Sequence, residues 1–262
     1  MGLLQAINPL YAVSGLVVGF IVGLTGVGGG SLMTPILVLL FGIHPATAVG
    51  TDLLYAGVTK AVGTVFHGRH GSVSWRIVGC LAAGSVPASI ITLYVLQKLG
   101  PQSPATSAII SVCLGIALLV TAASLVLRDR LVALTRGAGV LSPSIQAGLT
   151  VLTGLIIGVL VSISSVGAGA IGVTALYFLY PRLPARVIVG SDIAHAVPLT
   201  LVAGAGHWFL GSVDGAMLGS LLVGSLPGII AGSLSAPRIP DHILRPILAA
   251  VLLLVGARLI LA

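Results

Sequence analysis

The sequence predicts an all-α integral membrane protein, and three observations support that fold class. Of its 262 residues, 57% are hydrophobic and only 6% are charged, whereas a soluble domain carries about 25% charged residues. The chain divides into apolar segments that are bounded by glycine, proline and short polar runs. Its two parts also carry the same motifs in the same order, which indicates a duplicated unit.

The duplication is visible as matching motifs at a nearly constant distance. Three pairs are separated by 140 residues: VGTDLLYA at 49–56 and VGSDIAHA at 189–196, HGRHGSV at 67–73 and HWFLGSV at 207–213, GCLAAGSVP at 79–87 and GSLLVGSLP at 219–227. A fourth pair, GVGGG at 26–30 and SVGAG at 165–169, has an offset of 139, so one residue was added in the loop between. We therefore expect a first repeat at 1–127, a linker at 128–143 and a second repeat at 144–262.

Each repeat contains five apolar segments. Their ranges are 10–24, 31–43, 46–66, 73–97 and 104–127 in the first half, and 144–164, 169–180, 185–208, 213–235 and 243–261 in the second. The last three of each half are long enough to cross a hydrocarbon core of about 30 Å. The second segment of each half, with 12 or 13 residues, is too short to cross upright at about 1.5 Å per residue. Each repeat is therefore predicted to contain a helical hairpin followed by three transmembrane helices.

The distribution of Lys and Arg predicts the topology. If each hairpin returns to its own side, one face collects nine cationic residues: Arg69, Arg76, Arg128, Arg130, Arg136, Arg182, Arg186, Arg238 and Arg245. The other face collects Lys98 and Arg258, and this nine-to-two split follows the positive-inside rule. If each hairpin were one broken span, the split would be six against five.

Three crossings per half make the repeats inverted, with both termini extracytoplasmic and the 128–143 linker cytoplasmic in a cell (inner) membrane protein. Five full crossings per half would give the same parity, and the shortness of the second segments favours the hairpin.

A glycine-rich tip joins the first two segments of each half, at 25–31 and 164–170. Non-helical backbone is tolerated at membrane depth only where protein or a water-filled cavity satisfies it, and the N-terminus of a helix offers free N–H groups to an anion. Glycines spaced four apart, such as Gly15, Gly19 and Gly23, instead suit close helix packing. We therefore expect the tips to contribute these substrate-binding residues: Thr25, Gly28, Gly29, Gly30, Ser31, Ser165, Gly167 and Gly169.

Two carboxylates open the third segment of each half, and each follows a hydroxyl residue. These are the pairs Thr51–Asp52 and Ser191–Asp192. As helix-start residues, the aspartates would accept backbone N–H groups. As charges within the membrane, they would form a proton relay or brace the neighbouring tip.

Lys60 is the one cation well inside a predicted span. Its side chain either snorkels to the membrane surface or neutralises an anionic substrate. His195, which replaces Tyr55 of the first half, is either a hydrogen-bonded packing residue or a proton acceptor near neutral pH. Both residues join Thr51, Asp52, Ser191 and Asp192 in the expected substrate site.

Several classes of protein do not fit this sequence. No pair of histidines has metal-ligand spacing, and Cys80 and Cys113 lie in apolar runs, so no metal or cofactor is expected. No basic patch with interleaved aromatics indicates nucleic-acid binding. The chain has no Glu and no set of nucleophile, base and orienting group, so an enzyme is not expected. The prolines of Gly84-Ser-Val-Pro87 and Gly224-Ser-Leu-Pro227 are predicted to kink the fourth segments and shape a cavity.

The glycine and aspartate motifs resemble those of the TauE/SafE sulfite exporter family, also called the toluene sulfonate uptake permeases. The motifs are GLTGVGGGSLMTPIL and ATAVGTDLL, repeated more loosely as SSVGAGAIGVTAL and VIVGSDIAH, with Ala168 where the first half has Gly29. The resemblance covers essentially the whole chain. It implies a permease for small sulfur-containing anions such as sulfite or organosulfonates, with Gly28–Gly30, Thr51, Asp52, Ser191 and Asp192 lining or bracing the substrate path.

We therefore expect a secondary transporter that moves a small anion by alternating access, with a proton or a sodium ion as the coupling ion and membrane lipid around it. The alternative is an anion channel, or a permease for another small organic anion. Saturable flux coupled to a gradient distinguishes a transporter from a channel.

Overall fold

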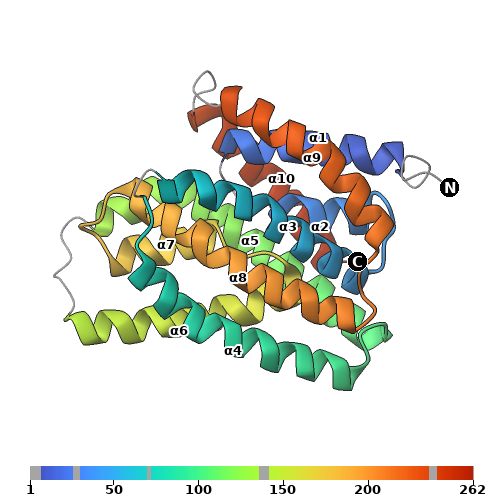
Figure 1. Ribbon diagram of the computed structural model, residues 1–262, viewed down its shortest axis with the longest axis horizontal. Helices are drawn as coiled ribbons and strands as arrows, with labels where there is room; N and C mark the ends of the chain where they lie inside the picture. Colours follow the sequence, from blue (N-terminus) through green and yellow to red (C-terminus); the bar gives the residue numbers. More distant parts are fainter. Residues whose placement is uncertain (1–6, 26–29, 70–71, 136–141, 236–240, 262) are drawn as a thin grey trace.

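A computed structural model describes residues 7–25, 30–69, 72–135, 142–235 and 241–261. Within these ranges the chain is helical, with no strand (Figure 1). The helices are α1 Pro9–Thr25, α2 Gly30–Leu39, α3 Pro45–Arg69, α4 Trp75–Leu99, α5 Pro104–Thr135, α6 Pro143–Ser164, α7 Ala170–Leu179, α8 Ala185–Phe209, α9 Gly215–Ser235 and α10 Asp241–Leu261.

Six of the described helices are long and apolar enough to cross a membrane: α4, α5, α6, α8, α9 and α10. Large apolar side chains stand exposed on their outer faces, among them Ile91 of α4, Ile230 of α9 and Leu254 of α10. An outer surface of this kind suits contact with lipid. The prediction of an all-helical, multi-pass membrane protein is therefore confirmed.

Helix α6 matches its predicted segment closely. With 22 residues it is long enough to cross a membrane by itself, although the sequence places it in a hairpin with the short α7. Helix α5 continues to Thr135, so the first part of the predicted linker is helical. The sequence at 128–135 contains neither Gly nor Pro, and nothing in it ends the helix earlier.

The helices pack in pairs that cross between the two halves. Helix α1 lies along α9, and Figure 1 shows the two side by side. A Cβ atom at Gly15 would overlap the carbonyl of Leu221, and one at Gly19 would overlap the carbonyl of Ser225. The glycines spaced four apart therefore let the two backbones touch, as the sequence predicts.

The same arrangement joins α4 and α6. A Cβ atom at Gly154 would overlap the carbonyl of Leu81, and one at Gly158 that of Ser85. These four residues occupy the repeat positions of the four at the α1–α9 contact. In each pair the residue numbers rise together, so the paired helices run parallel.

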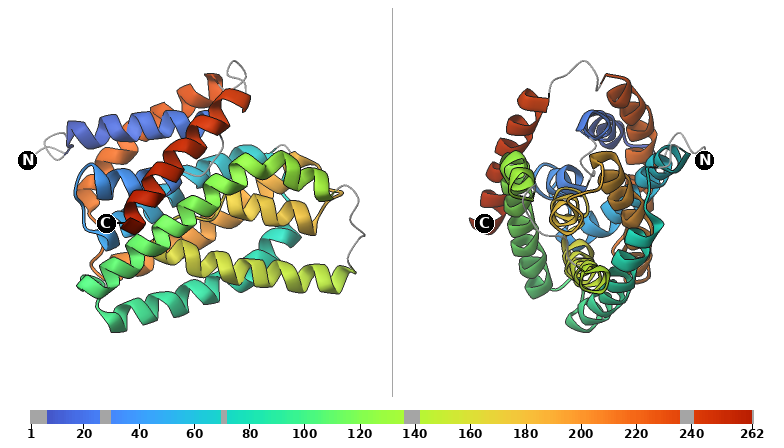
Figure 2. Two further views of the ribbon diagram at one scale, coloured as in Figure 1. Left: turned by 180° about the vertical axis from the view of Figure 1, so that it is seen from behind. Right: turned by 90° about the vertical axis from the view of Figure 1, so that its left-hand side faces the viewer.

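Helices α3 and α8 hold equivalent positions in the repeat and pack against each other. Gly57 of α3 faces Leu201, whereas Gly204 of α8 faces Leu54. Residue numbers rise along one helix as they fall along the other, so α3 and α8 run antiparallel. Helices α5 and α10 form a further pair of repeat mates in contact, and Figure 2 shows them along one side of the molecule.

The short helices α2 and α7 lie near the centre of the helix array when the molecule is seen along its long axis, and they are displaced from each other along that axis (Figures 1 and 2). Helix α2 contacts α3, and α7 contacts α5, α6 and α8. The side chains of Met33 and Leu37 of α2 are completely buried. The central position of α2 and α7 brings the ends of these short helices close to the carboxylates of α3 and α8.

Candidate substrate and ion site

The candidate site is centred on two buried carboxylates and one lysine. Asp52 of α3 is 0% exposed and Asp192 of α8 is 1% exposed. Lys60, two turns after Asp52 on α3, interacts electrostatically with both. The antiparallel contact of α3 with α8 explains how one lysine reaches a carboxylate from each half.

The Asp52 carboxylate has a hydroxyl donor. Thr34 Oγ1 of α2 donates a hydrogen bond to Asp52 Oδ2 at 2.5 Å. The second oxygen, Oδ1, is buried with no hydrogen-bond partner among the described residues. The hydroxyl of Ser165 is the other polar group near this carboxylate, although it lies outside hydrogen-bond geometry.

The surroundings of Asp192 are different. Its Oδ1 atom is buried and has no hydrogen-bond partner in the described part of the chain. It lies so close to Gly172 of α7 that a Cβ atom there would overlap it, and Ile157 of α6 borders the same space. Both bounds of α7 lie 140 residues after those of α2, which puts Thr174 in the place of Thr34, but Asp192 Oδ1 receives no hydrogen bond from it.

The second glycine tip interrupts the helix between α6 and α7, as the sequence predicts. Ser165 (φ 59°), Gly167 (φ 126°) and Gly169 (φ 130°) have positive φ angles, which favour glycine. The N–H of Gly172 donates to the carbonyl of Gly167 at 3.3 Å. The first N–H groups of a helix have no intrahelical partner, so the start of α7 at Ala170 presents donors to the site.

Lys60 joins the carboxylates to this tip. Its Nζ atom donates to the carbonyl of Ala168 at 3.4 Å, a long bond between residues 108 positions apart. Lys60 therefore lies against the interrupted helix, and its role in the substrate site stays a prediction.

Part of the first tip lies outside the described residues, including Gly28 and Gly29. Helix α1 ends at Thr25 and α2 begins at Gly30. Ser31, the next residue of α2, is 5% exposed. The structure thus places the start of α2 in the protein interior, on the same short helix as Thr34.

Thr51 and Ser191 fasten helices of opposite halves together. Thr51 Oγ1 accepts a hydrogen bond from the backbone N–H of Asp214 at 3.1 Å, and Ser191 Oγ accepts one from the N–H of Ser74 at 2.8 Å. Asp214 and Ser74 directly precede α9 and α4, at repeat-equivalent positions. Both hydroxyls therefore brace the starts of neighbouring helices, and their place along the substrate path stays a prediction.

His195 is hydrogen-bonded in the core. Its Nε2 atom lies 2.8 Å from Ser85 Oγ, and its Nδ1 atom is buried without a partner among the described residues. The mate of His195, Tyr55, makes the matching contact with Ser225 Oγ at 2.7 Å. This pair of contacts supports the packing interpretation of His195.

Sequence reasoning missed four residues that shape this site: Thr34, Gly172, Ser85 and Ser225. The two serines belong to the duplicated Gly-Ser-x-Pro motifs, which sequence reasoning assigned to proline kinks. The serine hydroxyl is repeated in both motifs, and this repetition is the signal that could have identified Ser85 and Ser225. Thr34 meets Asp52 only through the packing of α2 on α3, which no sequence motif shows.

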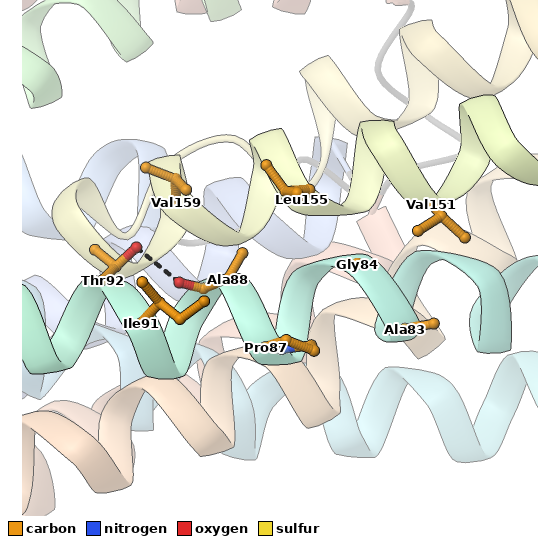
Figure 3. Close-up of a pocket in the computed structure, with 9 residues that line it drawn as sticks. All are labelled: Ala83, Gly84, Pro87, Ala88, Ile91, Thr92, Val151, Leu155 and Val159. Atoms are coloured by element: carbon orange, nitrogen blue, oxygen red, sulfur yellow. Dashed lines mark hydrogen bonds between the residues drawn. The ribbon is translucent and has the colours of Figure 1, made fainter.

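The pocket in Figure 3 lies elsewhere, between α4 and α6. Its volume is about 280 Å³, and its lining is apolar apart from Thr92, whose hydroxyl donates to the carbonyl of Ala88. Ile91 and Leu155 at its rim are exposed. The pocket contains no charged residue and none of the predicted site residues, so we do not assign the substrate site to it.

The described residues also contain no group of three or more His, Cys, Asp or Glu side chains that would hold a metal ion.

Comparison with known proteins identifies the family. The sequence profile described as "Sulfite exporter TauE/SafE" matches residues 11–259. The chain belongs to the TauE/SafE family. It is therefore a membrane transporter, and the resemblance seen in the glycine and aspartate motifs is confirmed.

Relatives of this TauE/SafE protein come from distant organisms. The "Probable membrane transporter protein YjnA" of Bacillus subtilis is 38% identical over 94% of this chain and 97% of its own length. YdhB, a probable membrane transporter protein of the same organism, is 28% identical over 78% of this chain and 80% of its own. A probable membrane transporter protein of Methanocaldococcus jannaschii is 24% identical over 79% and 74%. No solved structure matches the chain.

Proposed function

We propose that this TauE/SafE protein is a secondary permease that moves small sulfur-containing anions, such as sulfite or organosulfonates, by alternating access. The observation that carries this proposal is the position of Lys60, which interacts electrostatically with two buried carboxylates and lies against an interrupted helix. Charged groups inside a membrane protein mark substrate or ion pathways. Interrupted helices place their free N–H groups where an anionic substrate binds.

The way equivalent helices meet supports inverted repeats. Helices α3 and α8 are repeat mates and run antiparallel in contact. A two-fold axis that exchanges two antiparallel helices is perpendicular to them. If these helices cross the membrane, that axis lies in the membrane plane, which is the arrangement of an inverted-repeat transporter.

The relation of α6 to α4 supports a hairpin that turns back within the membrane. Ser162 near the end of α6 donates a hydrogen bond to Ser89 of α4 at 2.7 Å. Helix α4 runs on to Leu99, which is about 15 Å further at 1.5 Å per residue. The tip at 165–169 therefore lies beside the body of α4, and the ten residues of α7 lead back over about half a membrane core.

Flux measurements test the proposed function. The purified chain in proteoliposomes is expected to take up labelled methanesulfonate with saturable kinetics, and unlabelled sulfite is expected to compete. Vesicles without protein are the control. Flux that rises linearly with concentration would indicate a channel instead, and absence of any sulfonate or sulfite flux would overturn the proposal.

Topology provides a separate prediction. Single cysteines at Gly2 and Ala262, in a chain with Cys80 and Cys113 replaced by serine, are expected to react with a membrane-impermeant maleimide added outside the cell. A cysteine at Gly137 in the linker is expected to react only after the membrane is opened. Termini labelled on opposite faces would exclude inverted repeats with three crossings each.

A further inference from the structure

We propose that Asp192 is a proton-binding site and that its proton accompanies the anion through the membrane, so that transport is proton-coupled. This inference rests on the proposed function and names its coupling ion. It follows from the balance of charge in the site and from the different surroundings of Asp52 and Asp192.

The charge in the site is not balanced by its own residues. Asp52 and Asp192 contribute two negative charges and Lys60 contributes one positive charge, and Lys60 interacts with both carboxylates. Like charges at close range in a weakly polar medium repel strongly. The site thus carries one excess negative charge before a substrate anion adds another, and a bound proton removes that excess.

Asp52 and Asp192 differ in how readily each carboxylate would take up a proton. Thr34 donates a hydrogen bond to Asp52, and a donor of this kind stabilises an ionised carboxylate. Asp192 Oδ1 has no donor among the described residues and lies against Gly172. The Oδ1 atom of Asp52 also lacks a partner, so the hydrogen bond from Thr34 is what distinguishes the two carboxylates. The carboxylate without that donor avoids the cost of a buried charge more readily by taking up a proton.

A proton fits the surroundings of Asp192 better than a metal cation does. Its Oδ1 atom lies against the backbone of Gly172, and the side chain of Ile157 borders the space in front of that glycine. Hard cations bind through several oxygen ligands. Neither neighbour brings a side-chain oxygen, whereas a proton needs only the carboxylate itself.

The groups that face Asp192 are few. From α3, Lys60 interacts electrostatically with Asp192, and Asp52 interacts electrostatically with the same lysine. His195 lies one turn further along α8, and α4 meets it there with Ser85. Helices α6 and α7 contribute Ile157 and Gly172, which carry no charge.

Protonation therefore changes the partners of Lys60. With Asp192 neutral, Asp52 alone balances the ammonium, and the anion enters a site without excess negative charge. After the anion leaves, the proton leaves Asp192 and Lys60 again lies between two carboxylates.

Proteoliposomes loaded with the pH-sensitive dye pyranine test the coupling. Methanesulfonate is suitable because it is the anion of a strong acid and carries no proton itself at neutral pH. Wild-type protein is expected to acidify the lumen as sulfonate enters. In Asp192→Asn, which imitates the protonated form, the ratio of protons to sulfonate taken up is expected to fall at least tenfold, whatever the rate of sulfonate uptake.

Asp214→Asn is the matched control. Asp214 Oδ1 accepts a hydrogen bond from the N–H of Met217 at the start of α9, and asparagine caps a helix equally well, so wild-type coupling is expected. An unchanged ratio in Asp192→Asn, or uptake that depends on sodium and not on pH, would overturn the proton site while leaving a sulfonate permease. Absence of sulfonate flux in the wild type would overturn the proposed function and the coupling with it.

Discussion

Replacing Lys60 with methionine is expected to abolish transport and to lower the free energy of unfolding by about 1–3 kcal/mol, the common range for a change that disturbs a buried charged network. Lys60 interacts with both Asp52 and Asp192, and both carboxylates are buried. Methionine keeps the length and the apolar stem but leaves two carboxylates with no cation between them. The midpoint of thermal unfolding in detergent and methanesulfonate uptake measure the two effects.

A neutral triple variant separates stability from transport. In Lys60→Met/Asp52→Asn/Asp192→Asn no buried charge is left unpaired, and removing a whole buried ion cluster is often neutral for stability. We expect a thermal midpoint close to that of the wild type, with no transport. If Lys60→Met alone transports normally and unfolds at the wild-type temperature, Lys60 snorkels to the surface and does not belong to the site.

The Asp52–Lys60–Asp192 cluster could be predicted from the sequence only in part. The duplicated aspartates and the glycine tip at 164–170 are visible as repeated motifs. Lys60 is not duplicated: its mate Thr200 bonds the carbonyl of Ala196 in its own helix at 2.7 Å. Lys60 meets Asp192 only because α3 packs antiparallel to α8, and this pairing of distant helices is absent from any local pattern.

The hydroxyl residues illustrate the same difference. Thr51 and Ser191 stand out in the sequence because each precedes an aspartate. Their function as braces depends on the backbone N–H groups of Asp214 and Ser74, which are more than 100 residues away in the chain. A repeat predicts that both contacts exist if one does, but only the folded chain shows which partner each hydroxyl has.

Glycine spacing predicted contacts between helices better than the hydroxyl residues did. The sequence assigns Gly15, Gly19 and Gly23 to close helix packing, and the structure places Cβ positions at all three within overlap of the α9 backbone. Gly84 and Gly224 were assigned to kinks with the prolines that follow them. Each in fact also faces a backbone carbonyl across a helix pair, that of Val151 or Ala12.

The close backbone contact between α4 and α6 leads to the second prediction of a large effect on stability. Gly154→Leu is expected to separate α4 from α6 and to lower the free energy of unfolding by about 3 kcal/mol or more, the upper end of the cost of overpacking. The side chain would begin where the carbonyl of Leu81 already lies. A backbone carbonyl within a helix does not move aside as the end of a flexible side chain does.

Gly148→Leu on the same helix is the matched control. A Cβ atom at Gly148 would meet nothing within 4 Å, and leucine is a better helix former than glycine by up to about 1 kcal/mol. We therefore expect Gly148→Leu to unfold at or above the wild-type temperature in detergent, and Gly154→Leu well below it. The repeat extends the prediction, because Gly15 meets the carbonyl of Leu221 in the same way, so Gly15→Leu is expected to cost as much. Equal midpoints for Gly154→Leu and Gly148→Leu would show that α4 and α6 are not in close backbone contact in the folded protein.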